Sequence, residues 1–545
     1  MQRLLNACGL LLLWGLLTAV ALWARPLAPI DETRYAAVAW DMWAHGDWLV
    51  PHLNGEAYSH KPPLLFWLIQ LGWAVFGVVD WAPRLITALA TLADLFLLGA
   101  LARRLWPQDA ASARLVPWLF YGCFYVALFG TMLMFDLLLA TTVLLGLLGL
   151  LGAAEHGGRG HWALYALGIG LGVLCKGPAV LVYLLPVALL APWWQGGARV
   201  GGWWRWYRNV GLAVLAGAAL ALCWALPAAI VGGAEYREMI FWGQTAGRMV
   251  QSFAHQRPWW WYLPILPAIL LPWPLWLPLW RALPGLRTDF GRAGRFCAAW
   301  FLPGFLVFSA VSGKQVHYLL PLLPALLLLA ARALTQRPRA GGWLGHALVL
   351  APFALLGLVA AIGPFLAARQ GWPDWVAEVS PLWGLGVVLL VLAWARVLQA
   401  RRDPRWLVVL PVLCGVLLYA GVVRIAAPTL DARPIAAQIA ALQAQGVSVA
   451  HPGKYHGEFQ FAGRLQQPLQ VIARGSELDW AKANPQGALL LRHRALDAQA
   501  RAAAVFVQPY REREAALWRA ATLIEHPEYL AGEDAGRDDK PDSDD

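Results

Sequence analysis

The sequence predicts an all-α polytopic membrane bundle, with juxtamembrane helices at one surface and a small α/β domain after the last span. Three observations lead to this fold class. Of the 545 residues, 59% are hydrophobic and only 14% are charged, whereas soluble domains carry about 25% charged residues. Leucine-rich runs of membrane-spanning length recur along most of the chain. The 33 tryptophans exceed the needs of a soluble core, and bilayer interfaces favour indole rings.

About thirteen apolar stretches meet the roughly 20-residue requirement for a transmembrane helix. The first resembles a signal peptide, but it is long and ends in WARP without a convincing cleavage site, so it is interpreted as a retained helix. The predicted spans are 5–24, 83–102, 115–131, 136–153, 162–175, 177–193, 210–231, 261–280, 297–312, 318–331, 344–367, 382–396 and 407–425.

The basic residues favour one orientation of these spans. With the N-terminus in the cytoplasm, the inner connections carry most of the arginines of the membrane part and few acids, for example Arg103, Arg104 and Arg114. This distribution follows the positive-inside rule. The outer side then receives the segment 26–82 and everything after about residue 426. The net charge of +11 is scattered over short loops and indicates topology, so no nucleic acid is expected as a partner.

The end of the chain changes in composition. Helical patterns (ARPIAAQIAALQAQ, LDAQARAAAVFV) alternate there with strand-like runs (VSVAH, QPLQVIA, ALLLRH). We therefore predict three parts: a transmembrane domain over 1–428 that includes the outer loop 26–82, an outer α/β domain over 429–530, and a tail over 531–545. The tail is acidic and lacks apolar anchors, so it is expected to be disordered.

The first outer segment contains the pentapeptide DETRY, residues 31–35, directly after the first span. If residues 32–44 are helical, Asp31, Arg34 and Tyr35 share one face, on an amphipathic helix that lies along the membrane surface. The acids Asp31 and Glu32 could merely complement the helix dipole, but two of them beside basic residues favour a site. Lys61 precedes two prolines and a second apolar stripe; snorkelling to the interface is its alternative explanation.

Further ionisable side chains fall on the same outer side. Asp136, in MLMFDLLLA, begins an apolar helix, where an acid is more often functional than merely solvated. Lys176, in LCKGPAV, stands between two spans and is expected to meet an anion. Arg248 and His255 precede the aromatic stretch WWWY, with a solvated loop histidine as the alternative for His255. Tyr318 lies in GKQVHYLLPLLP, beside a lysine and a histidine.

Cofactor chemistry has few signals in the sequence. The six cysteines lie in or beside apolar segments without CxxC spacing, so neither a disulfide framework nor a zinc site is predicted. We expect no required cofactor. A divalent metal ion held by Asp31, Asp136 and His255 is an open alternative, since these side chains are suitable ligands but their spacing does not demand a metal.

These motifs together resemble the bacterial aminoarabinose (ArnT-type) lipid A transferases and, more broadly, the protein O-mannosyltransferase-related GT-C glycosyltransferases. The resemblance rests on DETRY, NGEAYSHKPPLLFWL, the aspartate of MLMFDLLLA, CKGP, QRPWWWYLP and HYLLPLLP, in this order from about residue 25 to 330. It implies a monomeric enzyme among the lipids of the bacterial inner membrane. The enzyme would move 4-amino-4-deoxy-L-arabinose, or a related pentose or hexose, from undecaprenyl phosphate to a lipid A phosphate or similar envelope acceptor at the periplasmic face.

The resemblance also implies roles for individual residues. Asp31 matches the catalytic acid of the first outer loop and Asp136 a second acid. The positions near the carrier phosphate, where positive charge stabilises the departing group, are Lys61, Arg34, Tyr35 and Arg248. Those expected to border the substrate cavity are Glu32, Tyr58, His60, Lys176, His255 and Tyr318. The family commonly reads Tyr-x-Glu-Lys-Pro-Pro where this chain has His60 before the lysine, which leaves another sugar or another acceptor open.

Three other functions were weighed against this one. A GT-C transferase with a protein or other glycan acceptor is the nearest alternative. A transporter for polyprenyl-linked sugars would place its ionisable groups near the bilayer midplane and often show internal repeats, whereas here the charges gather on one side and no repeat is visible. A purely structural scaffold would leave the DETRY and Lys61 groups without a purpose.

Overall fold

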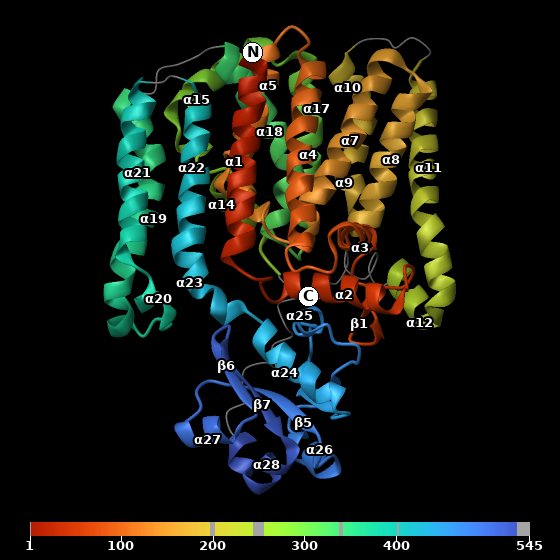
Figure 1. Ribbon diagram of the computed structural model, residues 1–545. Helices are drawn as coiled ribbons and strands as arrows, with labels where there is room; N and C mark the ends of the chain where they lie inside the picture. Colours follow the sequence, from red (N-terminus) through yellow and green to blue (C-terminus); the bar gives the residue numbers. More distant parts are fainter. Residues whose placement is uncertain (1, 197–201, 243–255, 337–341, 401–402, 531–545) are drawn as a thin grey trace.

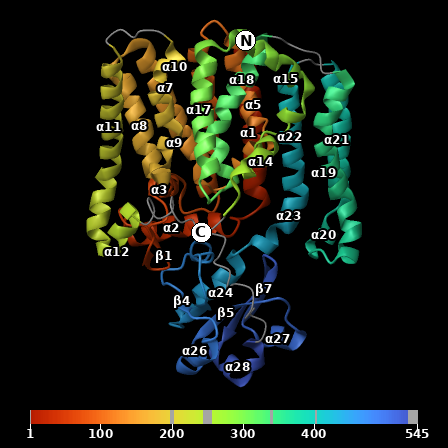
Figure 2. The same cartoon turned by 180° about the vertical axis from the view of Figure 1, so that it is seen from behind.

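The computed structural model describes residues 2–196, 202–242, 256–336, 342–400 and 403–530. Figure 1 shows a bundle of long helices with a small α/β domain attached at one end, and the N-terminus lies at the opposite end of the bundle. The view from behind in Figure 2 shows the same division. The predicted polytopic helical bundle agrees with this architecture; the α/β domain is called the outer domain below, and its position on the outer side of the membrane stays a prediction. The predicted tail 531–545 lies outside the described residues.

The long helices of the bundle match the predicted spans. Within the described ranges, nine helical segments are long and apolar enough to cross a membrane, and shorter apolar helices run over Cys8–Ala24 and Leu64–Phe76. The total of about thirteen spans stays a prediction. The long helices are α1 (Gln2–Ala24), α4 (Ala82–Leu105), α7 (Phe135–His156), α8 (Arg159–Lys176), α11 (Gly202–Val231), α17 (Gly291–Ala310), α18 (Leu323–Gln336), α19 (Gly342–Gln370), α21 (Pro381–Ala400) and α22 (Arg405–Leu418).

Several predicted spans are interrupted rather than continuous. The stretch 261–280 contains five prolines, which remove backbone donors and break helices, and it forms only short turns of helix. The span 318–331 opens with a 3₁₀ turn that contains Pro321. The short helical pieces of the bundle are α5 (Ala110–Tyr121), α6 (Phe124–Phe129), η1 (Gly177–Ala179), α9 (Val180–Leu189), α10 (Ala191–Gln195), α12 (Gly233–Glu238), η3 (Trp259–Trp261), α14 (Tyr262–Ile269), η4 (Trp273–Leu275), α15 (Leu277–Ala282), η5 (Leu283–Gly285), α16 (Leu286–Asp289), η6 (Val316–Leu322), α20 (Trp375–Glu378), η7 (Tyr419–Val423) and α23 (Arg424–Ala426).

Helices α7 and α8 are antiparallel neighbours that approach closely through glycines. A Cβ atom on Gly168 would lie 2.6 Å from Gly146 Cα, and one on Gly149 would lie 2.5 Å from the backbone nitrogen of Tyr165. Small residues allow such close approach of helices in membranes, where packing rather than the hydrophobic effect drives association. The close fit sets the start of α7 beside the end of α8.

The first outer segment forms short elements between the bundle and the outer domain. They are helix α2 (Asp31–His45), the hairpin of β1 (His52–Leu53) and β2 (Glu56–Ala57), and helix α3 (Leu64–Phe76). The predicted helix over 32–44 is therefore present. Most of its residues from Glu32 to Met42 are buried, which differs from the expected amphipathic helix with a solvated face. The reason is that the outer domain covers the face that would otherwise meet water.

The outer domain contains a five-stranded sheet with the order β4-β3-β5-β7-β6. Strand β3 pairs in parallel with β4 and β5, whereas β7 is antiparallel to both β5 and β6. Leu490 of β5 lies opposite Leu517 of β7 at the centre of the sheet. The strands are β3 (Val449–Pro452), β4 (Gln470–Ile472), β5 (Ala488–His493), β6 (Phe506–Tyr510) and β7 (Arg513–Arg519); the helices are η8 (Ala427–Leu430), α24 (Arg433–Ala444), α25 (Gln460–Gly463), α26 (Glu477–Ala483), α27 (Ala498–Ala503), α28 (Ala520–Glu525) and η9 (Pro527–Leu530).

The strand-like and helical runs predicted here agree with the structure except at one place. The runs QPLQVIA and ALLLRH contain β4 and β5, β3 begins in VSVAH and ends one residue after it, and ARPIAAQIAALQAQ contains α24. The run LDAQARAAAVFV was expected to be helical throughout, but helix α27 ends at Ala503 and strand β6 begins at Phe506. The β-branched Val505 and Val507 favour extended backbone, and pairing with β7 fixes it.

The outer domain docks on α2, the hairpin and α3. The ring of Phe461 in α25 stacks on Trp73 of α3 with 5.0 Å between centroids, and Trp40 of α2 donates a hydrogen bond to the carbonyl of Leu465 at 2.9 Å. At the hairpin turn, Asn54 accepts from the backbone nitrogen of Leu469 at 2.7 Å and donates to its carbonyl at 2.9 Å. Helix α2 is thereby held between the bundle and the domain.

Candidate active site at the outer end of the bundle

The ionisable residues singled out in the sequence gather at the end of the bundle that carries the outer domain. In Figure 1 helix α1 runs from the N-terminal end of the bundle to this end, where α2 follows it. The segment before α7 reaches the same place, because the backbone nitrogen of Leu133 donates to Glu32 at 2.7 Å. Segments that are about a hundred residues apart in sequence therefore meet here.

Asp31 and Arg34 form an ion pair on the first turn of α2. Arg34 Nη2 lies 2.5 Å from Asp31 Oδ1, and the two side chains differ in exposure, with 44% for Asp31 and 8% for Arg34. Burial alone would lower the pKa of Arg34, but the fields of Tyr58, Tyr35 and Asp31 raise it. Arg34 is thus a permanent cation in a sheltered position, and Asp31 keeps an accessible carboxylate edge.

Glu32, the neighbouring acid, has a different environment. It forms a buried ion pair with Arg25, and its oxygens accept hydrogen bonds from the backbone nitrogens of Ala28 at 2.6 Å and Leu133 at 2.7 Å. Burial would raise the pKa of this carboxyl, but Arg25 and Arg84 hold it below its usual value. The sequence predicts that Glu32 borders the substrate cavity, whereas its side chain is 1% exposed. It joins α2 to the end of α1 and to the start of α7.

Asp136 and Lys176 form a second ion pair, where the start of α7 meets the end of α8. Lys176 Nζ lies 2.5 Å from Asp136 Oδ1, and Asp136 is almost fully buried. His317 of η6 is on the other side of this carboxylate, with its Nε2 3.9 Å from Asp136 Oδ2. The Lys176 ammonium also lies 4.7 Å from the centre of the Tyr318 ring, which fits a cation–π contact. The side chains of Asp136, Lys176, His317 and Tyr318 thus lie together where α7, α8 and η6 meet.

Aromatic rings connect the two ion pairs. Phe135, next to Asp136, meets the edge of Tyr35 at 4.9 Å and of Phe66 at 5.7 Å between centroids. Tyr35 is within electrostatic range of both Asp31 and Asp136; burial, followed by the field of Asp31, raises its pKa. The phenol therefore stays protonated and keeps its O–H as a hydrogen-bond donor.

The segment that contains Lys61 lies against the same aromatic rings. Tyr58 is buried and its ring lies 5.2 Å from that of His60 and 6.2 Å from that of Phe66. His317 is within electrostatic range of both Lys61 and Asp31. The rings of Tyr58 and Phe66, on either side of Lys61 in the sequence, connect through Phe135 to Tyr35 and place this segment at the same end of the bundle as α2. Arg248 and His255, also expected near the site, lie outside the described residues.

Several side chains that organise this region have no role that local sequence patterns predict. His317 stands beside Tyr318 in the sequence. Its closeness to Asp136 cannot be inferred from the sequence, because the two residues lie on helices that are distant along the chain. Arg25 and Arg84 were missed entirely. Arg84 donates to the carbonyls of Ala21 at 3.1 Å and Arg25 at 2.7 Å at the end of α1. A buried arginine early in an apolar span, in WAPRLITALA, is the signal that could have found it.

The two acids considered as metal ligands, Asp31 and Asp136, each have a basic side chain as their nearest ionic partner. Within the part of the chain that the structure describes, no group of three His, Cys, Asp or Glu side chains is arranged to hold a metal ion. Asp136 has Lys176 as its nearest ionic partner, and Asp31 has Arg34. The third ligand considered for a metal, His255, lies outside the described residues.

Comparison with known proteins identifies the fold. Two crystal structures of ArnT from Cupriavidus metallidurans superpose on the chain. The one bound to undecaprenyl phosphate has a TM-score of 0.73 and 21% identity, and it covers 94% of this chain and 97% of that one. The apo state has a TM-score of 0.74 and 20% identity, with coverages of 95% and 98%. The fold is therefore that of a GT-C membrane glycosyltransferase.

Sequence comparison places the chain within that class. Residues 60–230 match the family model described as dolichyl-phosphate-mannose-protein mannosyltransferase. An undecaprenyl phosphate-alpha-4-amino-4-deoxy-L-arabinose arabinosyl transferase of Pseudomonas aeruginosa strain PAO1 is 35% identical over 72% of this chain and 70% of its own. The enzyme of the same name from Edwardsiella ictaluri is 32% identical over 74% of each chain. The chain belongs to this ArnT-type family of lipid-linked-sugar glycosyltransferases.

Proposed function

We propose that this protein transfers 4-amino-4-deoxy-L-arabinose, or a related pentose or hexose, from undecaprenyl phosphate to a lipid A phosphate or similar envelope acceptor. The names of its relatives support the donor and the sugar class. The single observation that carries the proposal for the site is that the two acids lie at the two ends of one aromatic contact: Tyr35, beside the Asp31–Arg34 ion pair, meets Phe135, beside Asp136, at 4.9 Å between ring centroids. One reacting centre can therefore be served by both acids. The reaction would take place at the periplasmic face of the inner membrane, on a monomer.

The departing phosphate is the group that most needs stabilisation. In the proposed reaction an acceptor oxygen bonds to the anomeric carbon, the bond from that carbon to the phosphate oxygen breaks, and undecaprenyl phosphate leaves with the electron pair. Arg34 and Lys61 supply fixed positive charge for that anion, and charge fixed in a sheltered site is more effective than in water. Because these cations meet the need, the chemistry requires no metal.

Asp31 and Asp136 have separate tasks in this proposal. The accessible carboxylate of Asp31 (44% exposed) can take a proton from an acceptor hydroxyl within hydrogen-bond reach. An acceptor phosphate is already anionic, and Asp31 would then orient it or stabilise the positive charge that develops on the sugar. Asp136 fixes the Lys176 ammonium beside Tyr318 and positions this cation at the border of the site.

The identity of the sugar and of the acceptor follows from one experiment. The purified protein is reconstituted in liposomes with undecaprenyl phosphate-linked aminoarabinose and lipid A, and the products are weighed by mass spectrometry. Addition of one aminoarabinose to lipid A is the expected result. If lipid A stays unmodified by the folded protein, the lipid A branch of the proposal is wrong. Mass spectrometry of lipid A and envelope glycans with and without the gene provides the matching test in cells.

A further inference from the structure

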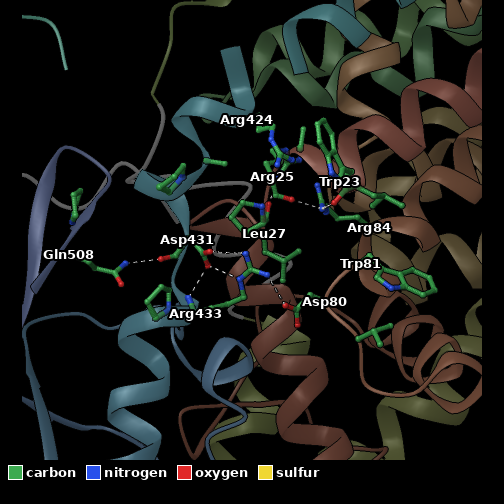
Figure 3. A pocket seen from close by; sticks show the side chains of 18 of the residues that line it. Trp23, Arg25, Leu27, Asp80, Trp81, Arg84, Arg424, Asp431, Arg433 and Gln508 are labelled. Carbon is green, nitrogen blue, oxygen red and sulfur yellow. Dashed lines mark hydrogen bonds and ion pairs between the residues drawn. The ribbon is translucent and has the colours of Figure 1, made fainter. Parts of the chain in front are cut away.

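A polar cavity lies at the junction of the bundle and the outer domain, bordered by Arg25 and Arg84 but not by the ion pairs of Asp31 and Asp136. It has a volume of about 900 Å³ and is lined by the end of α1, the start of α4, α23 and residues of β6. Figure 3 shows that side chains from these elements point toward one another across it. Asp31, Lys61 and Asp136 are not among its lining residues, so the cavity is separate from the proposed active site.

Arginines dominate the charge of this cavity. Its lining contains five arginines and two aspartates. Asp80 pairs with Arg464 at 2.6 Å and with Arg433 at 3.6 Å, and Asp431 pairs with Arg433 at 2.7 Å. Arg25 is neutralised by the buried Glu32. The positive charge that remains belongs to the other two arginines of the lining.

Arg84 and Arg424 carry this excess charge. Arg84 is 2% exposed and donates only to backbone carbonyls at the end of α1, and its Nε has no hydrogen-bond partner within the described residues. The helix end explains the hydrogen bonds of Arg84, and no carboxylate within the described residues lies in ion-pair contact with its guanidinium. Arg424 lies over the ring of Trp23 at 3.8 Å, and in the described part of the chain no carboxylate pairs with it. Figure 3 shows Arg424, Trp23 and Arg84 together on one side of the cavity.

The surroundings of the cavity are those of a lipid site. Trp23 and Trp81 line it and are 58% and 37% exposed, and tryptophans of this kind mark the interface of a bilayer. Along α1, the exposed residues Leu12, Leu16 and Ala19 lead to Trp23. Their spacing of three and four residues puts them in one stripe on the helix. Acyl chains can lie along this stripe while a headgroup enters the cavity.

We propose that this cavity binds the phosphate headgroup of an anionic membrane phospholipid. Arg424 and Arg84 neutralise the phosphate, and the acyl chains lie along the exposed stripe of α1. Guanidinium groups recognise phosphate through paired hydrogen bonds. Because the ligand contacts α1, α4, α23 and the outer domain at once, it fastens the domain to the bundle. Since this site is distinct from the active site, the inference does not depend on the sugar or the acceptor.

Native mass spectrometry of the full chain tests the proposal. The protein is released from phosphatidylcholine-containing micelles and titrated with phosphatidylglycerol, with phosphatidylcholine, or with inorganic phosphate. We expect saturable binding of phosphatidylglycerol that is lost or weakened about tenfold in Arg424→Glu, since this change reverses one interfacial charge. Arg424→Lys, which keeps the charge but loses the paired hydrogen bonds of the guanidinium, should bind more weakly than the wild type and more tightly than Arg424→Glu.

The matched control is Arg369→Glu, an exposed arginine in the last turn of α19. This variant should bind phosphatidylglycerol as the wild type does. Equal binding of phosphatidylglycerol by the wild type and Arg424→Glu, or an equal loss in Arg369→Glu, would overturn the proposed site. Equal binding of phosphatidylcholine, or saturation by inorganic phosphate alone, would overturn its assignment to an anionic lipid. A folded Arg424→Glu protein is verified by its unfolding temperature in phosphatidylcholine.

Discussion

Lys176 Nζ lies 2.5 Å from Asp136 Oδ1, although 40 residues separate the two side chains in the sequence. The carboxylate is 2% exposed and the ammonium 13%, so each charge depends on the other for its stabilisation. The glycine-mediated approach of α7 and α8 brings the two together. The pair thus links the packing of the bundle to the electrostatics of the proposed site.

Removing one member of this pair should destabilise the protein more than removing both. Lys176→Met leaves the Asp136 carboxylate buried without its partner, at a cost of about 3–5 kcal/mol. The double variant with Asp136→Leu leaves no unpaired charge and should recover much of that loss. Thermal unfolding in detergent measures the three proteins. Additive losses in the double variant would show that the pair is not coupled in this way.

The adjacent acids Asp31 and Glu32 should differ in their effect on stability. Glu32→Gln weakens a buried ion pair with Arg25 and should destabilise the protein by about 3 kcal/mol. Asp31→Asn alters a pair whose acid is 44% exposed, and its stability should change by less than about 1 kcal/mol. Unfolding temperatures of the two variants compare them directly. The opposite order would mean that the structural role belongs to Asp31.

The stack of Phe461 on Trp73 should hold α2 in place through the outer domain. Phe461→Ala removes a buried ring, and such truncations cost about 3–5 kcal/mol. We expect faster hydrogen exchange in α2 together with a lower rate of sugar transfer, because α2 carries Asp31. Val471→Ala, in the same domain but 49% exposed, is the control and should change neither. Unchanged exchange in α2 after loss of Phe461 would contradict the docking role.

The outer domain should lose stability as the pH falls below about 6.5. Burial lowers the pKa of His451 to about 4. As the pH falls, this imidazole is therefore protonated in the unfolded chain before it is protonated in the folded domain. The resulting loss approaches about 3 kcal/mol near pH 4. Glu458, paired with Arg492 at 2.8 Å, has a pKa lowered from 4.5 by Arg492 despite burial. The stabilisation of the folded domain by the Glu458 carboxylate is present above pH 4.5 and is also lost as the pH falls.

Hydrogen exchange of β3 and β5, corrected for the intrinsic rate, measures this pH dependence. His451→Gln should flatten the profile between pH 6.5 and about 4, whereas His526→Gln, which changes a half-exposed histidine of the same domain, should leave it as it is. A wild-type profile without a slope in this range would show that His451 titrates normally in the folded domain.

Local patterns in the sequence predicted much of this structure, and long-range contacts explain the remainder. The apolar runs and the arginine distribution predicted the fold class and the helix over 32–44, whereas a shared site of Lys61 and Asp31 stays a prediction. They could not separate Asp31 from Glu32, because the distinguishing partner of Glu32 is Arg25 in the loop before the helix. The burial of α2 was missed for a similar reason: the covering Phe461 lies hundreds of residues away, where sequence periodicity carries no information.

The rate of sugar transfer in proteoliposomes tests the central claim most directly, namely that Asp31 and Lys61 frame one site at the outer end of the bundle. Asp31→Asn and Lys61→Ala are compared with the wild type and with Lys482→Ala, an exposed lysine of the outer domain, using a polyprenyl phosphate-linked sugar as donor. We predict that each of the first two loses roughly a hundredfold in rate or more, while it unfolds near the wild-type temperature and Lys482→Ala stays fully active. Wild-type rates in both Asp31→Asn and Lys61→Ala would contradict the account.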